Sequence, residues 1–153
     1  MVSMKLLFGI GNPGKEYEGT RHNIGRAFSA HEGGYESDVF VNLSGPAVKK
    51  LKAQHQLKND SIIIAHDDLD IEFGKFKLSF DRNSAGHKGV QSIIDALKTK
   101  KFWRLRFGIA NSKLKDARAA GKVPEFVLSK FTPTEQKQLT AIFKEAHDRI
   151  AHA

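Results

Sequence analysis

The chain contains no cysteine among its 153 residues. This absence excludes disulfide bonds, thiolate metal sites and a cysteine nucleophile, and it is typical of a cytoplasmic protein. Long apolar runs are also absent: the longest have only the length of a strand, and the N-terminal residues lack the apolar stretch of a signal peptide. We therefore predict a cytoplasmic protein without a membrane-spanning segment.

Three familiar signatures are missing or degenerate. No Walker A pattern occurs, and the residues around Ser44 lack the Gly-x-Ser-x-Gly turn that exposes a serine nucleophile. The spacing Gly9-x-Gly11-x-x-Gly14 imitates a dinucleotide-binding loop, but Pro13 interrupts it and a polar loop follows where a helix should begin. These observations argue against a phosphate-binding loop, a serine hydrolase and a Rossmann cofactor site.

Acidic residues are too few to balance the basic ones. Twenty-five lysines and arginines against 17 aspartates and glutamates give a net charge of +8, which favours a polyanionic partner, nucleic acid before membrane. Two groups of basic residues are dense enough to follow phosphates. They are Lys98, Lys100, Lys101, Arg104 and Arg106, followed by Lys113, Lys115, Arg118 and Lys122.

The order of apolar segments predicts one α/β domain over residues 1–153, a mixed twisted sheet flanked by helices. Strands are expected at 5–10, 61–65, 75–80 and 105–110, with a further short one near 39–41. In the strand near residue 105, alternation directs Arg104 and Arg106 outward. Helices are expected at 23–31, from an N-cap at Ser44 to about Gln56, at 86–98, and after a capping box at Thr132–Glu135.

Polar side chains cluster directly after the first predicted strand. Its apolar run ends at Gly11-Asn12-Pro13-Gly14, and Tyr17, Arg21, His22 and Asn23 follow. Open α/β sheets place ligand sites beyond the carboxyl ends of their strands. We therefore interpret His22, between an arginine and an amide on a loop held by proline and glycines, as a site residue.

A second polar cluster, His66-Asp67-Asp68-Leu69-Asp70, ends the central strand. Two interpretations fit it: the carboxylates bind a divalent cation, or one carboxylate orients an imidazole and stabilises its protonated form. Asp67 is closest to the strand end and is the best candidate to face His22. Asp68 and Asp70 are interpreted as residues of a solvated turn.

Two further segments add polar groups at helix starts. Asn42 lies at a strand-to-helix turn, and Ser84-Ala85-Gly86-His87-Lys88-Gly89 exposes backbone N–H groups suited to an anion. The predicted site contains a histidine, a carboxylate and several amides, but no credible nucleophile or metal cluster. This combination indicates a histidine that activates water. Such a site hydrolyses an ester more easily than an amide, because the alcohol is the better leaving group. The basic surface predicts that this ester is attached to a polyanion.

These segments resemble the bacterial-type peptidyl-tRNA hydrolase family. The matching parts run in family order across nearly the whole chain: Gly9–Gly25, Asn42–Gly45, Ala65–Asp70 with Gly74, Gly86–Ser92, Arg104–Ile109 and Phe126–Leu128. The resemblance implies hydrolysis of the ester between a peptide and the 3′ ribose of tRNA. It further implies a monomeric cytoplasmic enzyme that binds tRNA and needs neither a metal nor a cofactor.

The resemblance also carries residue roles. It implies that His22 is the general base and that Asp67 orients it, while Asn12 and Asn42 hold the peptide main chain. Substrate contacts are further expected from Tyr17 near the tRNA end and from His87 and Lys88. Residues expected to face the tRNA are Lys98, Lys101, Arg104 and Arg106.

Two departures from the family pattern stand out. A deletion between residues 26 and 40 removes most of a helix and a strand pair, so a reduced sheet is expected. Lys88 replaces the asparagine of the family segment Gly-His-Asn-Gly. Lys88 either donates to the oxyanion in place of the asparagine or weakens the site. The alternative function is therefore a catalytically weak or inactive RNA-binding relative of the same fold.

Overall fold

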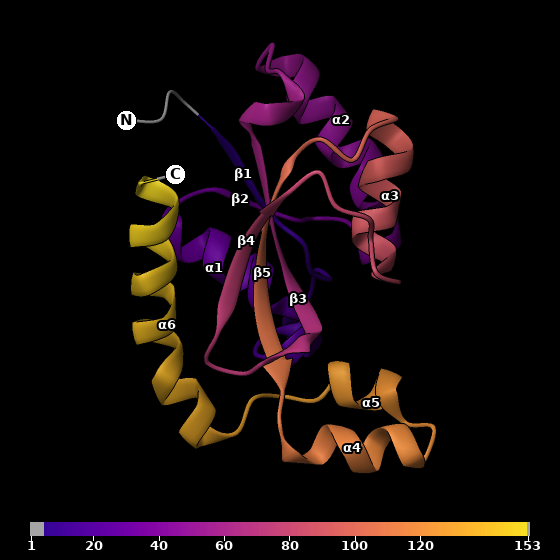
Figure 1. Cartoon of the computed structure of the whole chain (residues 1–153), viewed down its shortest axis with the longest axis vertical. Coiled ribbons are helices and arrows are strands. Elements are labelled where there is room, and N and C mark those ends of the chain that lie inside the picture. The colour runs from indigo at the N-terminus through magenta and orange to yellow at the C-terminus, as the bar shows by residue number, and fades with distance from the viewer. Residues whose placement is uncertain (1–4, 153) are drawn as a thin grey trace.

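A mixed sheet organises the structure, a computed structural model that describes residues 5–152 (Figure 1). Within this range the strand order is β2–β1–β3–β5–β4. Strands β1 (Leu6–Gly9), β2 (Tyr35–Glu36), β3 (Ile62–Glu72) and β5 (Trp103–Ala110) are parallel, while β4 (Phe76–Phe80) runs antiparallel to β5. The predicted fold class is confirmed.

Helices cover both faces of the sheet. Helices α2 (Ser44–Gln54) and α3 (Lys88–Leu97) lie on one face, and α1 (Ile24–Glu32) and α6 (Pro133–Ala151) lie on the other (Figure 1). Helices α4 (Ser112–Ala119) and α5 (Val123–Val127) lie together at one end. No helix in the described part of the chain is long and apolar enough to cross a membrane.

The core is divided in two by the sheet, and β3 contributes to both halves. Ile62 and Ile64 pack toward α2 and α3, whereas Ile63 packs toward α1 and α6. All three side chains are buried, which confirms the expectation that this unalternating apolar run is a central strand. The strand is longer than predicted and continues through the acidic run to Glu72, so Asp68 and Asp70 belong to the strand and not to the predicted turn.

The segment shortened by the deletion holds little regular structure. Helix α1 ends at Gly33, whose φ of 71° gives the left-handed conformation that favours glycine. The edge strand that follows is Tyr35–Glu36, so the predicted strand at 39–41 is wrong. Residues Val41–Leu43 instead form the 3-10 turn η3, in which the backbone N–H of Val41 donates to the side chain of Asn12.

Ser44 does not cap α2 as predicted. It is the first residue of the helix, fully buried, and its hydroxyl donates to the carbonyl of Val41 at 2.7 Å. The capping box of α6, by contrast, is confirmed: Thr132 accepts from the N–H of Glu135, and Glu135 accepts from the N–H of Thr132.

The prediction that Arg104 and Arg106 point to solvent is wrong. The two residues are only 1% and 7% exposed. The Arg104 guanidinium lies 4.2 Å from the ring centre of Phe102 and donates to the carbonyl of Lys100. Arg106 donates to the carboxylate of Asp68 at 2.9 Å. Strand alternation did place both arginines on one face, but neighbouring side chains cover that face.

Candidate active site

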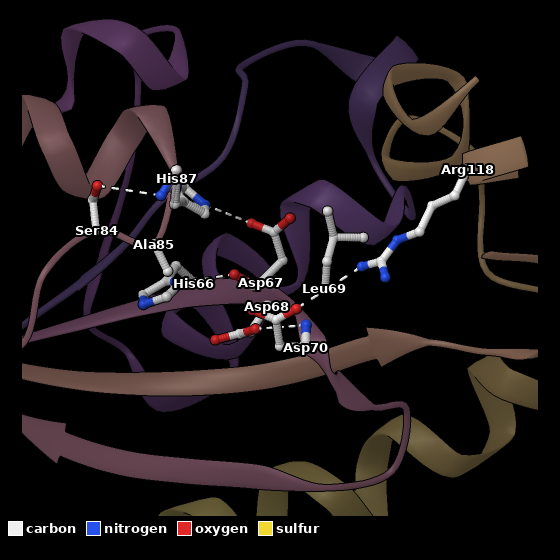
Figure 2. Close-up of a pocket in the computed structure, with 10 residues that line it drawn as sticks. His66, Asp67, Asp68, Leu69, Asp70, Ser84, Ala85, His87 and Arg118 are labelled. Carbon is white, nitrogen blue, oxygen red and sulfur yellow. Dashed lines mark hydrogen bonds and ion pairs between the residues drawn. The ribbon is translucent and has the colours of Figure 1, made fainter. Parts of the chain in front are cut away.

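One carboxylate binds two imidazoles at the carboxyl edge of the sheet. Asp67 in β3 accepts from Nδ1 of His22 with Oδ2 and from Nε2 of His87 with Oδ1, both at 2.8 Å. Figure 2 shows the second of these bonds, from the start of α3 to β3. The predicted pairing of His22 with Asp67 is therefore present, and His87 joins them on the other oxygen.

The turn that carries His22 is anchored by the buried side chain of Arg21. His22 lies in the 3-10 turn η2 (Arg21–Asn23). The preceding Arg21 is 3% exposed and forms an ion pair with Glu135 at 2.9 Å. Its guanidinium lies 5.0 Å and 5.2 Å from the ring centres of Phe126 and Phe131. Sequence reasoning missed this anchor, although an arginine next to a candidate base was a signal worth following.

The start of α1 also fixes this turn, because Gly25 packs directly on β3. A Cβ at Gly25 would lie 2.1 Å from the carbonyl oxygen of Ala65, a separation that no real side chain tolerates. Any larger residue would push η2 and its histidine away from Asp67. The absence of a side chain at Gly25 thus allows η2 to lie close enough to β3 for His22 to reach Asp67.

Asn12 and Asn23 connect the loop after β1 to η2. The Asn23 side chain accepts from the N–H of Asn12 and donates to its carbonyl, both at 2.9 Å. The Asn12 side chain accepts from the N–H of Val41 at 3.0 Å. Its amide nitrogen has no such bond within residues 5–152 and is the end available to a ligand.

Hydrogen bonding fixes the tautomer of His87. Its Nδ1 caps α3 by accepting from the N–H groups of Gly89 at 3.1 Å and Val90 at 3.2 Å. Nδ1 therefore carries no hydrogen, and Nε2 donates its hydrogen to Asp67. On His22 the arrangement is reversed: Nδ1 donates to Asp67, which leaves Nε2 with a free lone pair when the ring is neutral.

Burial and charge compete in setting the ionisation of this cluster. Burial lowers the pKa of His22, but the charge of Asp67 and its hydrogen bond outweigh burial and raise that pKa above its ordinary value. Burial raises the pKa of Asp67, yet the two histidines outweigh it and hold the pKa well below the usual range of a carboxyl group. Asp67 therefore stays ionised, and its charge stabilises the protonated form of His22.

A groove of about 730 Å³ opens beside this cluster. Its polar lining includes six of the predicted site residues: Asn12, His22, Asn42, Asp67, His87 and Lys88. Its apolar lining, which sequence reasoning missed, is formed by Phe40, Val41, Leu69, Val123, Pro124 and Val127. No serine, threonine or cysteine lines the groove in the part of the chain that the structure describes. The described lining therefore offers no side-chain hydroxyl or thiol as a nucleophile.

The remaining predicted residues lie outside the groove. Tyr17 packs edge-on against Phe40, with ring centres 6.1 Å apart. Lys98 and Lys101 are exposed just after α3, and they line a separate shallow pocket. The basic group expected to face tRNA is thus divided into two exposed lysines and two buried arginines.

Residues 5–152 contain one group of side chains dense enough to hold a metal ion: His22, Asp67 and His87. Both imidazoles are already bonded to different oxygens of the same carboxylate. The acidic cluster Asp67, Asp68 and Asp70 does not converge, because Asp68 pairs with Arg106 at 2.9 Å and Asp70 lies 3.9 Å from Arg118. The geometry therefore favours the interpretation in which a carboxylate orients an imidazole.

The fold and the groove define an α/β enzyme of the hydrolase class. The family model described as peptidyl-tRNA hydrolase matches residues 35–153. Peptidyl-tRNA hydrolase of Aquifex aeolicus is 36% identical, and the alignment covers 95% of this chain and 87% of that protein. The enzyme of Thermodesulfovibrio yellowstonii is also 36% identical, with 96% and 90% covered.

Structural comparison agrees with the sequence comparison. The crystal structure of peptidyl-tRNA hydrolase from Acinetobacter baumannii superimposes with a TM-score of 0.81 at 28% identity, covering 97% of this chain and 87% of that one. The chain belongs to the peptidyl-tRNA hydrolase family.

Proposed function

We propose that this protein hydrolyses the ester between a peptide and the 3′ ribose of tRNA, with His22 as general base. The observation that carries the proposal is the 2.8 Å bond from Nδ1 of His22 to Asp67. This bond leaves Nε2 of His22 free to accept a proton, on a ring that lines the groove. The sequence resemblance, the family membership and the absence of serine, threonine and cysteine from the described groove lining support the same reaction.

The chemistry requires one proton to move twice. Nε2 of His22 takes a proton from water while the water oxygen attacks the ester carbonyl, which gives a tetrahedral intermediate with a negative oxygen. Asp67 stabilises the imidazolium that forms. As the intermediate collapses, the bond to the ribose oxygen breaks and His22 returns the proton to that oxygen. The products are a peptide with a free carboxyl group and a tRNA with a free 3′ hydroxyl.

Other groove residues bind the substrate in this proposal. Asn12 and Asn42 hold the peptide main chain, and the apolar wall receives peptide side chains. His87 fixes the second oxygen of Asp67 and borders the substrate. Lys88 is exposed at the rim and donates to the developing oxyanion, in place of the asparagine that the family has there.

The tRNA body is proposed to bind outside the groove. Phosphate contacts are assigned to the exposed Lys98 and Lys101, and Tyr17 borders the tRNA end. Arg104 and Arg106, which are buried, hold the local structure. We further propose that the enzyme acts as a monomer in the cytoplasm, where peptidyl-tRNA arises.

Release of tRNA from N-acetylated aminoacyl-tRNA tests the reaction. His22→Ala is expected to lower kcat by about 10²- to 10⁴-fold, because a positioned general base contributes that much. EDTA is expected to leave the rate of the unmodified protein unchanged. The matched control is His152→Ala, which removes an exposed histidine at the far end of α6.

Two results would contradict the proposal. Turnover by His22→Ala at the rate of the unmodified protein would show that His22 is not the general base. No turnover by the unmodified protein, together with salt-sensitive binding of tRNA, would instead support the RNA-binding relative.

A further inference from the structure

A second hollow continues the groove between helices α2 and α3. It has a volume of about 550 Å³, and Asn42 and Lys88 line both it and the groove. Neither His22 nor Asp67 lines it, and the reaction above gives it no role. We call this hollow the helix trough. Its remaining lining comes from the first turn of α2 and from α3: Pro46, Gln91, Ser92, Asp95 and Ala96.

Close packing of α2 on α3 fixes the floor of the helix trough. The two helices lie side by side on one face of the sheet (Figure 1). The N–H of Gly45 donates to the hydroxyl of Ser92 at 2.8 Å, and a Cβ at Gly45 would lie 2.1 Å from the carbonyl oxygen of Ser92. The spacing of the helices is therefore set by contact between their backbones and does not depend on flexible side chains.

The polar side chains along the helix trough have free hydrogen-bonding groups. The exposed side chain of Asn42 makes no hydrogen bond to another residue of the described range 5–152 and offers both a donor and an acceptor. Gln91 donates from Nε2 to Oδ1 of Asp95 at 2.9 Å, which leaves Oε1 of Gln91 and Oδ2 of Asp95 as acceptors. The trough thus has a donor at its junction with the groove and acceptors farther along α3.

The helix trough has the length of a short stretch of extended chain. Lys88 and Asp95 lie seven positions apart on α3. A rise of about 1.5 Å per residue separates them by about 10 Å along the helix axis. An extended peptide covers that distance with about three residues. The carboxylate of Asp95 repels phosphate, so the trough suits the peptide half of the substrate better than the tRNA half.

We propose that the helix trough binds the main chain of the peptide residues that extend beyond the groove. This inference rests on the proposed function, because the ester places the C-terminal residue of the peptide at His22 and the rest of the peptide farther away. A main-chain carbonyl accepts from Asn42 at the junction, and main-chain N–H groups donate to Gln91 and Asp95. Because these contacts involve no peptide side chain, the trough selects for the length of the peptide and not for its sequence.

Kinetics with two substrates on the same tRNA tests this role. One substrate carries an N-acetylated amino acid, and the other carries an N-acetylated hexapeptide. The ratio of kcat/KM for the longer substrate over the shorter one is expected to fall by roughly three- to tenfold in Gln91→Ala and in Asp95→Ala, because each variant loses one hydrogen bond to the peptide. Gln138→Ala and Asp148→Ala, exposed on α6, are the matched controls. An unchanged ratio in both trough variants would overturn the proposal.

Titration of the isotope-labelled full chain with the free acetylated hexapeptide locates the binding without turnover. The side-chain amide signal of Gln91 and the backbone amide signals of Asp95 and Ala96 are expected to shift. The acetylated amino acid is expected to shift signals of the groove residues Val123 and Val127 instead. Hexapeptide shifts confined to Val123 and Val127 would overturn the proposal. A fully active His22→Ala variant would overturn only the proposed catalytic mechanism, because the titration does not depend on turnover.

Discussion

Asp67 binds two histidines that differ in what they can do with a proton. Nδ1 of His87 already accepts from two backbone N–H groups, so protonation of His87 would break the cap of α3. His22 caps no helix, and protonation at its Nε2 leaves the hydrogen bond from its Nδ1 to Asp67 intact. Hydrogen bonds therefore occupy both ring nitrogens of His87 and leave Nε2 of His22 open, which suits His22 to the proposed role of general base.

The pH dependence of kcat/KM follows from this difference. The pKa of His22 is raised and the base works when neutral, so kcat/KM is expected to rise with pH through a midpoint above 6.5. In Asp67→Asn the charge that raises the pKa is gone while burial remains, so the midpoint is expected to move down as the plateau falls. A pH profile of both proteins measures this. An unmoved midpoint in Asp67→Asn would show that another group titrates.

Lys88 provides a second prediction for a single residue. Lys88→Ala is expected to lower kcat by about tenfold or more with little change in KM, because oxyanion contacts act in the transition state. Lys88→Asn, which restores the family residue, is expected to recover most of the rate. Steady-state kinetics beside the exposed control Lys144→Ala measures both. Full activity of Lys88→Ala would mean that the lysine points away from the reaction.

At the scale of elements, the ion pair between Arg21 and Glu135 joins the turn of His22 to the start of α6. Glu135 also completes the capping box and accepts from Asn111 at 3.3 Å. One carboxylate thus connects η2, the loop after β5 and α6, and we expect the position of His22 to depend on the start of α6.

Removal of that carboxylate is expected to affect stability and rate together. Glu135→Ala leaves Arg21 buried without its partner, so the free energy of unfolding should fall by about 3 kcal/mol, and kcat should fall because η2 loses its anchor. Urea denaturation and kinetics measure the two effects. The control is Glu145→Ala, exposed on the same helix. A stable Glu135→Ala variant with normal kcat would show that the anchor has no effect on the site.

Sequence patterns predicted the elements that alternate or repeat clearly, such as α3, α6 and the apolar part of β3. They failed where a distant side chain decided the outcome. Buried Ser44 donates its hydroxyl to the carbonyl of Val41, and Asp68 within β3 pairs with Arg106. In the site, His22 and Asp67 were paired correctly by strand-end reasoning. The bond from His87 depends on the path of the loop from β4 to α3, which no local pattern specifies.

At the scale of the whole molecule, the net charge of +8 predicts a strong salt dependence of tRNA binding. The affinity is expected to fall linearly on a log–log plot against salt concentration. Lys98→Ala and Lys101→Ala should each reduce the slope of this plot by about one, the contribution of one phosphate contact. Lys137→Ala on α6 should leave the slope unchanged. Equilibrium binding across a salt series measures this. Equal slopes in all variants would place the phosphate contacts elsewhere.

The link from Arg21 to Glu135 spans 114 positions of sequence, which has a consequence for synthesis of the protein itself. A growing chain contains both His22 and Asp67 long before Glu135 has been added. Until then Arg21 has no carboxylate to hold it and η2 lacks its anchor. The order of translation thus makes the anchor of η2 one of the last contacts that the chain can form.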